Sequence, residues 1–239
     1  MLSIKNVSKT YGGNKVKAVD SINLEVKSKQ ILGFIGPNGA GKTTTMKMIT
    51  GILLPDEGNI QINGVDIVDM PIQAKQNFGY VPDSPDMFLR LTGMEYLNFM
   101  ADTYNVDSAT RQESIKSTGA IFEMTGALSA RIQSYSHGMR QKIVIMGALM
   151  HNPALWILDE PLTGLDPRSS FQLKEMMRQH ADAGNSVLFS THMLEVAEKL
   201  CDKIALINKG KINFFGELEE LKAQHNNLSL EEIFMEVTA

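Results

Sequence analysis

A motif suited to phosphate binding follows a short apolar run near the start of the sequence. It has the pattern G-x-x-x-x-G-K-T and consists of Gly36, Pro37, Asn38, Gly39, Ala40, Gly41, Lys42 and Thr43. Glycines let backbone N–H groups curve around an anion, and a helix that begins at the motif directs its positive dipole end toward the same charge. We expect Lys42 to reach the outer phosphates of a nucleoside triphosphate, Thr43 to offer its hydroxyl to Mg²⁺, and Thr44 to lie in the same site.

Two adjacent carboxylates, Asp159 and Glu160, are the second chemically informative feature. They follow the apolar run 155–158, which is typical of a buried strand, and ligands of open α/β sheets gather at such strand ends. In P-loop enzymes the aspartate helps to hold Mg²⁺, and an adjacent glutamate orients or deprotonates the attacking water. The alternative is an acidic pair that only caps the next turn. Combined with the phosphate loop, the pair predicts metal-dependent hydrolysis of a triphosphate.

The composition indicates a folded chain without general affinity for nucleic acid. The 239 residues are 43% hydrophobic and 21% charged, which suffices for a substantial core in one large domain, with or without an inserted subdomain. The formal net charge of −4 gives no overall attraction to nucleic acid or anionic lipid, so we expect no nucleic-acid partner. The single cysteine, Cys201, cannot form an intrachain disulfide; we expect a buried small hydrophobe in a reducing cytoplasm.

Hydrophobic patterning divides the chain into three stretches. Residues 1–84 contain short alternating strands around the phosphate loop. Between residues 84 and 134 helical spacing dominates, and Thr92 with Glu95 forms a capping-box pattern. From Asn152 onward, strands alternate with helices in the manner of a parallel sheet. The apolar runs of that part are 155–158, 187–189 and 204–207.

Two helices carry clear start signals. Asp166 and Pro167 are a suitable N-cap and first-turn pair for a helix that runs to Ala183. Ser136 is a suitable N-cap for an apolar helix over residues 139–150.

Further motifs surround these residues in a fixed order. They are Tyr11 in Lys9-Thr10-Tyr11-Gly12, the signature segment Tyr135-Ser136-His137-Gly138-Met139 followed by Arg140-Gln141-Lys142, the loop Leu162-Thr163-Gly164-Leu165-Asp166, and Ser190-Thr191-His192 at a strand end. With the phosphate loop and the acidic pair, this order resembles the ATP-binding subunit of an ABC transporter, over residues 1–216.

The resemblance implies an α/β fold and a division of the single domain. The expected fold is a P-loop NTPase (RecA-like) core with an N-terminal antiparallel β-subdomain and an inserted α-helical subdomain. Residues 1–84 and 152–216 would form the catalytic core with the β-subdomain, and residues 85–151 the helical subdomain with the signature helix. Residues 217–239 would form a C-terminal helical tail; residues 230–234 by themselves suggest a short amphipathic helix.

The same resemblance assigns roles in a head-to-tail dimer that encloses two ATP molecules. Lys42, Glu160 and His192 would be catalytic in one copy, while Ser136 and Gly138 of the second copy would cover the γ-phosphate. Tyr11 would stack on adenine. Thr43, Asp83 and Asp159 would hold Mg²⁺.

Two departures from the family pattern concern this site. Asp83 stands where the family usually has glutamine, and its shorter, acidic side chain could contact Mg²⁺ directly or through water. The alternative is a simple turn aspartate after Val81-Pro82. In the signature, His137 replaces the usual glycine and Met139 the usual glutamine. Because Ser136 and Gly138 are present, phosphate coverage is expected to be retained.

A membrane partner follows from the resemblance. The longest apolar run, residues 143–150, is shorter than the ~20 residues that cross a bilayer, and the N-terminal residues lack the apolar core of a signal peptide. Transport would therefore need a separate integral membrane permease, placing this chain at the cytoplasmic face of the membrane. Residues 135–141 resemble the branch that exports drugs, antibiotics, peptides or lipid-like molecules. Methionines between Met87 and Met150 would serve docking or, alternatively, core filling.

Functions other than transport could use an ATP site of this kind. A soluble ABC ATPase that drives assembly of a protein complex, such as an iron–sulfur cluster scaffold, would have an identical ATP site. DNA-repair or chromosome-type ABC ATPases carry a long coiled coil or zinc-binding insert, for which residues 84–134 are too short. A kinase would need an acceptor site, and a nucleotide-binding regulator would not need both Glu160 and His192.

Overall fold

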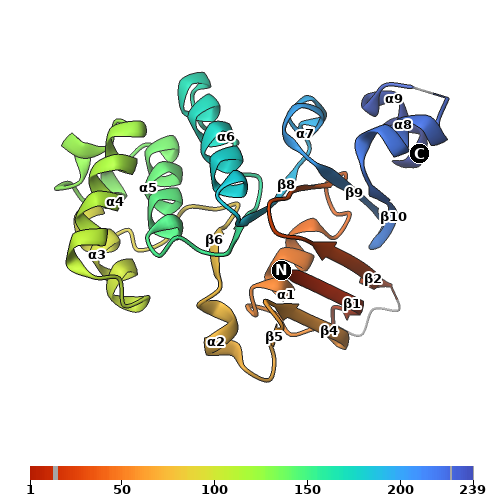
Figure 1. The fold of residues 1–239 in the computed structure, drawn as a ribbon, viewed down its shortest axis with the longest axis horizontal. Helices are drawn as coiled ribbons and strands as arrows, with labels where there is room; N and C mark the ends of the chain where they lie inside the picture. The colour runs from red at the N-terminus through yellow and green to blue at the C-terminus, as the bar shows by residue number, and fades with distance from the viewer. Residues whose placement is uncertain (13–15, 227, 239) are drawn as a thin grey trace.

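The strands of the chain form two sheets, and the larger one positions the expected site. The computed structural model describes residues 1–12, 16–226 and 228–238. In spatial order, the strands of the larger sheet are β10 (Lys211–Gly216), β9 (Lys203–Asn208), β3 (Ile31–Ile35), β8 (Ser186–Thr191), β7 (Leu155–Leu158) and β6 (Phe78–Val81). β10 pairs antiparallel with β9, whereas the remaining pairs are parallel. The carboxyl ends of β3, β7 and β8 therefore meet at one edge (Figure 1).

The smaller sheet is antiparallel and comes from the N-terminal part of the chain. Its strands, in spatial order, are β2 (Lys17–Val26), β1 (Leu2–Thr10), β4 (Glu57–Ile62) and β5 (Val65–Asp66). Asn63 and Gly64 join β4 to β5 with φ angles of 51° and 77°. Asparagine and glycine tolerate this left-handed backbone, which is why the pair makes a tight hairpin.

Helices cover both faces of the larger sheet and form a separate group at one side (Figure 1). Their bounds are α1 (Lys42–Ile49), α2 (Pro71–Lys75), α3 (Gly93–Thr103), α4 (Ser108–Ile121), α5 (His137–Leu149), α6 (Pro167–Asp182), α7 (Leu194–Leu200), α8 (Leu218–Gln224) and α9 (Leu230–Thr238), with 3₁₀ turns at Thr125–Ala127 and Ile132–Ser134. No helix in the described ranges combines the length and apolar character that a membrane span requires.

The helical insert consists of α3, α4 and α5, on the left of Figure 1. The expected capping box is present: the Glu95 amide donates to Thr92 Oγ1 over 3.1 Å, and the Thr92 amide donates to Glu95 Oε2 over 2.8 Å. The buried ring of Tyr96 in α3 packs against Gly147 of α5. A Cβ at Gly147 would lie 2.6 Å from that ring, so the close approach of the two helices depends on glycine.

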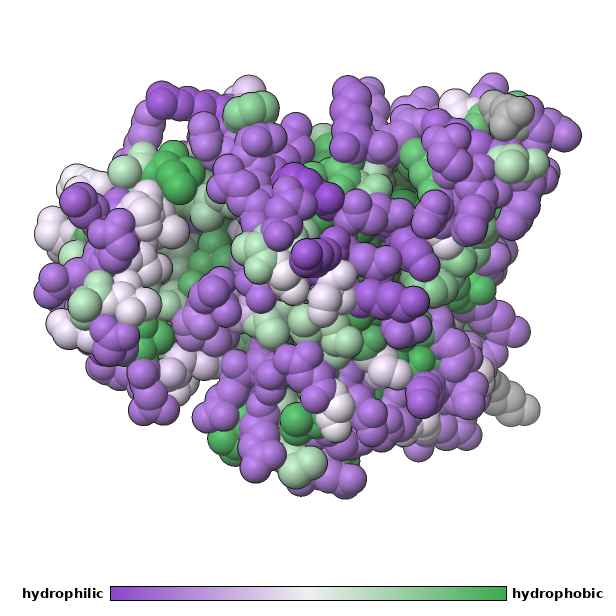
Figure 2. All heavy atoms as spheres, in the orientation of Figure 1, coloured by the Kyte–Doolittle hydropathy of each residue, from purple (hydrophilic) through white to green (hydrophobic). Residues whose placement is uncertain are grey.

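The core lies on both faces of the larger sheet, as the continuous apolar runs predict. Along β7, Trp156 packs on the face covered by α5 and α6, whereas Leu155 and Ile157 pack toward α1 and the smaller sheet. All three side chains are fully buried. Alternate side chains of a strand point to opposite faces, so a strand covered on both sides needs apolar residues throughout. On the side of the molecule shown in Figure 2, polar side chains cover most of the surface, and apolar side chains lie mainly in recesses.

Two helices differ from the sequence expectation, one in its start and one in its presence. α5 begins at His137, two residues before the expected start at Met139, because Ser136 Oγ caps the Met139 amide and the residues between already belong to the first turn. α2 was not expected at all. It has five residues and buries only Ala74, so it leaves no apolar periodicity in the sequence. The helix after Asp166 agrees with expectation, and Asp166 accepts the Ser169 amide over 2.9 Å.

Candidate active site

The phosphate loop connects β3 directly to α1. Two of its glycines are required by backbone crowding. A Cβ at Gly36 would lie 2.3 Å from the Ile207 carbonyl oxygen, and one at Gly41 would lie 2.7 Å from the Ala18 carbonyl oxygen. Gly41 also has φ of 111°, a backbone conformation that favours glycine. The loop is thus held between β2 and β9, with the first turn of α1 at its end.

Lys42 is a buried cation whose ammonium lies inside this loop. Its side chain is 7% exposed, and Nζ donates to the carbonyl oxygens of Gly36 over 2.7 Å and Pro37 over 3.3 Å. Nζ also lies 3.6 Å from Oε1 of Glu160. A buried ammonium is stable only when it is paired and hydrogen-bonded, and this arrangement meets both conditions. The phosphate of a nucleotide would take the place of the carboxylate beside the ammonium.

The two carboxylates are held by a serine on the neighbouring strand. Ser190 Oγ donates to Asp159 Oδ1 over 2.5 Å, and the Glu160 amide donates to Ser190 Oγ over 2.9 Å. Asp159 is fully buried, and burial raises the pKa of its carboxyl. The charges of Asp83 and Glu160 act in the same direction, whereas the hydrogen bond from Ser190 and the nearby Thr43 hydroxyl oppose the rise in the pKa. A nearby cation would stabilise the carboxylate form.

The donor set around Asp159 fits Mg²⁺. Asp159 Oδ2 is buried and has no hydrogen-bond partner among the described residues, which leaves one carboxylate oxygen for a metal. Asp83 and Thr43 line the neighbouring cavity. The described part of the chain contains no group of three His, Cys, Asp or Glu side chains that could hold a metal by itself. Mg²⁺ is commonly bound through one or two carboxylates together with substrate phosphates, so this incomplete set suits it.

Glu160 links the lysine to the histidine at the end of β8. Its Oε2 lies 2.9 Å from His192 Nδ1, while its Oε1 faces Lys42. The Glu160 side chain is 15% exposed and that of His192 59%, so the chain of contacts leads from the buried loop to solvent. Glu160 has φ of 47°, a left-handed conformation that is uncommon outside glycine. Its side chain lines the cavity beside the phosphate loop.

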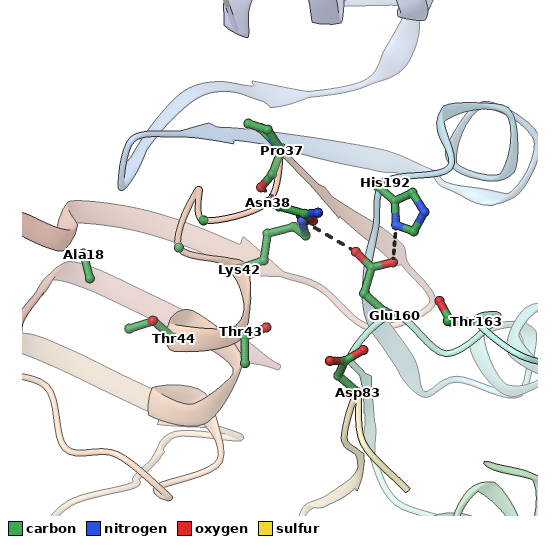
Figure 3. A pocket seen from close by; sticks show the side chains of 12 residues that line it. Ala18, Pro37, Asn38, Lys42, Thr43, Thr44, Asp83, Glu160, Thr163 and His192 are labelled. Carbon is green, nitrogen blue, oxygen red and sulfur yellow. Dashed lines mark hydrogen bonds and ion pairs between the residues drawn. The ribbon is translucent and has the colours of Figure 1, made fainter. Parts of the chain in front are cut away.

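These groups enclose a cavity of about 350 Å³ (Figure 3). It is lined by Ala18, Pro37, Asn38, Gly39, Gly41, Lys42, Thr43, Thr44, Asp83, Glu160, Thr163 and His192. In Figure 3, Lys42 and His192 approach different carboxylate oxygens of Glu160, while Thr43 lies below Lys42 and Asp83 below Glu160. Lysine, carboxylate, hydroxyl and imidazole groups that follow the four strands β3, β6, β7 and β8 therefore share one space.

Of the expected site residues, Gly36, Ala40 and Asp159 are buried behind the cavity lining. Tyr11, Ser136 and Gly138 lie outside the cavity. Tyr11 is 46% exposed and lines an adjoining cleft with Gly39. Ser136 is exposed at the start of α5, and Gly138 packs against Gly164, where a Cβ would lie 2.8 Å from the carbonyl oxygen. Tyr11 is near the phosphate loop, because its hydroxyl lies 3.4 Å from Thr44 Oγ1. The single chain thus leaves the signature serine and glycine away from its own phosphate loop.

Some residues of the site have no role that a sequence motif indicates. Ser190 was part of the histidine motif, but nothing in the sequence indicated that its hydroxyl joins the two carboxylates. Ala18 of β2 and Thr163 in the loop after β7 line the cavity. Pairing of β7 with β8 places Leu158 opposite Phe189, and this register is what brings Ser190 to Asp159. Its only sequence signal is a polar residue at the end of an apolar run.

Comparison with known proteins agrees with this geometry. The family model described as ABC transporter matches residues 19–163, more than half of the chain. The chain belongs to the ABC transporter family. As an ABC ATP-binding subunit it is an ATPase with the P-loop α/β fold that the motifs predicted. The ABC-type transporter ATP-binding protein EcsA of Bacillus subtilis (strain 168) is 35% identical over 240 residues, covering 100% of this chain and 96% of that protein.

Other members of the ABC family are similarly close. The linearmycin resistance ATP-binding protein LnrL of Bacillus subtilis (strain 168) is 36% identical, covering 92% of this chain and 70% of its own length. A solved structure of the ATP-binding subunit of an ABC transporter has a TM-score of 0.96 at 32% identity, covering 100% of both chains. A dimeric ATP-binding cassette bound to ADP and Pi has a TM-score of 0.82 at 22% identity, over 91% of this chain and 99% of that one, and shares the fold.

Proposed function

We propose that this ABC ATPase hydrolyses ATP in the cavity between the phosphate loop and Glu160, and that hydrolysis drives a separate membrane permease. The observation that carries the proposal is the contact chain from Lys42 through Glu160 to His192 at the mouth of this cavity. Lys42 would offset charge on the phosphates, and Glu160 would take a proton from the attacking water. His192 would hold Glu160 and contact the γ-phosphate. Mg²⁺, held by Thr43, Asp159 and Asp83, would stabilise phosphate charge.

The exposed start of α5 supports a second copy as the partner. Ser136 and His137 are exposed, and the first N–H groups of a thirteen-residue helix carry partial positive charge. Such a helix start favours an anion, yet the cavity of the same chain does not include it. A head-to-tail dimer would place Ser136 and Gly138 of one copy over the γ-phosphate in the other. The related cassette described above is dimeric.

This dimer is tested by light scattering on a hydrolysis-deficient variant. Glu160→Gln saturated with ATP and Mg²⁺ should elute as a dimer, whereas the same variant with ADP should not. Adding Ser136→Ala should weaken the dimer, because it removes the expected γ-phosphate contact. Asp107→Ala is a matched control, since Asp107 caps α4 as Ser136 caps α5 but lies away from the signature. A monomer at saturating ATP in Glu160→Gln would refute the proposed sandwich.

The surface beside Asp83 supports docking of a membrane subunit. Met87 and Phe88 are 37% and 43% exposed, and Phe99 is 46% exposed. The Phe88 ring lies 5.4 Å from the rings of both Phe99 and Tyr96, so Phe88 and Phe99 form one exposed apolar surface above the buried Tyr96. Exposure of Met87 and Phe88 is the outcome that favours docking over core packing. We propose that a short cytoplasmic helix of the permease covers this surface.

Export is proposed from the relatives together with the signature segment. The name of LnrL refers to linearmycin resistance, and another relative, 34% identical, is a Nod factor export ATP-binding protein of Cupriavidus metallidurans. We therefore propose a drug, antibiotic, peptide or lipid-like molecule as the transported class. In this role the chain would act at the cytoplasmic face of the membrane. A soluble assembly ATPase would instead associate with soluble scaffold proteins.

Coexpression with the integral membrane protein encoded beside this chain tests the coupling. The purified complex should hydrolyse ATP faster than the chain alone, and Phe88→Ser should abolish the acceleration while leaving the basal rate. Phe171→Ser is the matched control, because Phe171 is 55% exposed on α6 rather than on the insert. Equal effects of both substitutions, or recovery of soluble scaffold proteins in place of the membrane protein, would contradict permease docking.

A further inference from the structure

We propose that Ser190 is a positioning residue that sets the metal-binding carboxylate and the general base together. The proposal rests on the ATPase function proposed above and goes beyond it, since it concerns a residue that contacts neither nucleotide nor attacking water. The Ser190 hydroxyl lies between Asp159 and Glu160, and it uses its hydrogen-bonding capacity on both. One side chain thereby orients two adjacent residues that have different chemical tasks.

The first task is the orientation of the Asp159 carboxylate. Ser190 Oγ donates its proton to Oδ1 over 2.5 Å, while Oδ2 of the same carboxylate has no partner among the described residues. The hydroxyl thus distinguishes the two oxygens and leaves one available for a cation. Partners of this kind around metal ligands fix the orientation of the ligand, and their loss typically lowers metal affinity or activity 10- to 100-fold.

The second task is the backbone conformation of Glu160. Its amide donates to Ser190 Oγ over 2.9 Å, and its φ of 47° lies in the left-handed region. A non-glycine residue holds such a conformation only where its surroundings stabilise it. The hydrogen bond from the Glu160 amide to Ser190 Oγ supplies part of this stabilisation. It directs the Glu160 side chain toward Lys42 and His192 rather than along the direction of β7.

The position of Ser190 in the sheet makes it rigid. It is fully buried in β8, where β3 pairs on one side through Phe34 and β7 on the other through the Leu158–Phe189 register. A side chain on a central strand has little freedom, so its oxygen holds a constant position relative to the phosphate loop. Rigid support is what a site needs when a small displacement of a ligand lowers the rate.

The same strand provides a matched control, Ser186. It is also fully buried, and its Oγ donates to the Lys27 carbonyl oxygen over 2.8 Å, at the opposite end of β8. Ser186→Ala therefore removes a buried hydroxyl and a hydrogen bond without touching the site. Both alanine variants should lower the urea concentration of half-unfolding by a similar amount. If the two variants are equally stable but differ in ATPase rate or Mn²⁺ affinity, the difference comes from where the lost hydroxyl lies and not from a loss of stability.

Two readouts test the proposal on the chain of 239 residues. The first is the rate of phosphate release at saturating ATP and Mg²⁺, and the second is Mn²⁺ binding to the ADP-bound chain, measured by electron paramagnetic resonance. Ser190→Ala should lower both the rate and the Mn²⁺ affinity by roughly 10- to 100-fold, whereas Ser186→Ala should leave both near wild type. Ser190→Cys keeps the shape of the side chain at a slightly larger volume and supplies only a weak S–H donor, so it should fold and share the defects of Ser190→Ala.

The possible results separate this proposal from the proposed function. Wild-type rate and Mn²⁺ affinity in Ser190→Ala would overturn the positioning role, as would equal losses in Ser190→Ala and Ser186→Ala. Absence of ATP hydrolysis in the unmodified chain would refute the proposed function instead. In that case the difference in Mn²⁺ binding between the two alanine variants would still decide what Ser190 does, because that measurement needs no turnover.

Discussion

Replacing Glu160 with glutamine separates hydrolysis from nucleotide binding. The substitution keeps the size of the side chain and removes its capacity to accept a proton from water. General-base assistance contributes about 10²- to 10⁴-fold, so the rate of phosphate release should fall by that factor. At 1.36 kcal/mol for each tenfold change, the loss corresponds to about 3–5 kcal/mol of transition-state stabilisation.

The same substitution should leave ATP affinity equal to or above that of the wild type. Glu160 Oε1 lies 3.6 Å from Lys42 Nζ and competes with an incoming phosphate for this cation. Two unit charges about 4 Å apart attract each other by at most ~4 kcal/mol at an effective dielectric constant of 20. Glutamine removes that competitor. The Gly36 and Pro37 carbonyl oxygens continue to hold the ammonium in place.

The assay combines single-turnover phosphate release with titration of a fluorescent ATP analogue, both with Mg²⁺. Glu175→Gln is the matched control, because Glu175 is exposed on α6 and distant from the cavity. Near-normal turnover in Glu160→Gln would remove Glu160 from the mechanism. A marked loss of nucleotide affinity with normal folding would show that Glu160 does not compete for Lys42, and the reasoning from their separation would fail.

Three further predictions concern the packing around the site and the core. Gly36→Ala places a Cβ 2.3 Å from the Ile207 carbonyl oxygen, so it should abolish ATP binding in a filter assay and lower the free energy of unfolding by roughly 1–3 kcal/mol. Gly126→Ala should have neither effect, because no atom lies within 4 Å of the added Cβ. Burial raises the pKa of the Cys201 thiol, so a thiol reagent should modify the native chain far more slowly than the urea-unfolded chain at pH 8; equal rates would contradict burial. Burial lowers the pKa of His151 from 6.5 to about 4. Between these two pH values the unfolded chain binds a proton at His151 and the folded chain does not. The free energy of unfolding should therefore decline as the pH falls from 6.5 to 4, by at most about 3 kcal/mol. His151→Gln should flatten this pH dependence in urea titrations, and an unchanged slope would assign it to other groups.

The chemistry of the site could be predicted from the sequence because it depends on local patterns. The phosphate loop needs glycines at defined positions, a lysine and a hydroxyl within eight consecutive residues, and the glycines by themselves allow the backbone angles that the loop requires. Capping at Thr92, Ser136 and Asp166 is local for the same reason. The roles given to the site residues, Tyr11 and Asp83 included, stay predictions, since they depend on a nucleotide and a metal.

Only the tertiary structure decided which distant residues meet. Ser190 reaches Asp159 across 31 residues of sequence, and Lys42 meets Glu160 because β3 and β7 flank β8. Strand order and register arise from packing of apolar faces over the whole sheet, and no short pattern specifies them. The fold also placed Ser136 and Gly138 outside the cavity of their own chain. The residue types thus determined what chemistry is available, while long-range strand pairing decided which of those groups act together.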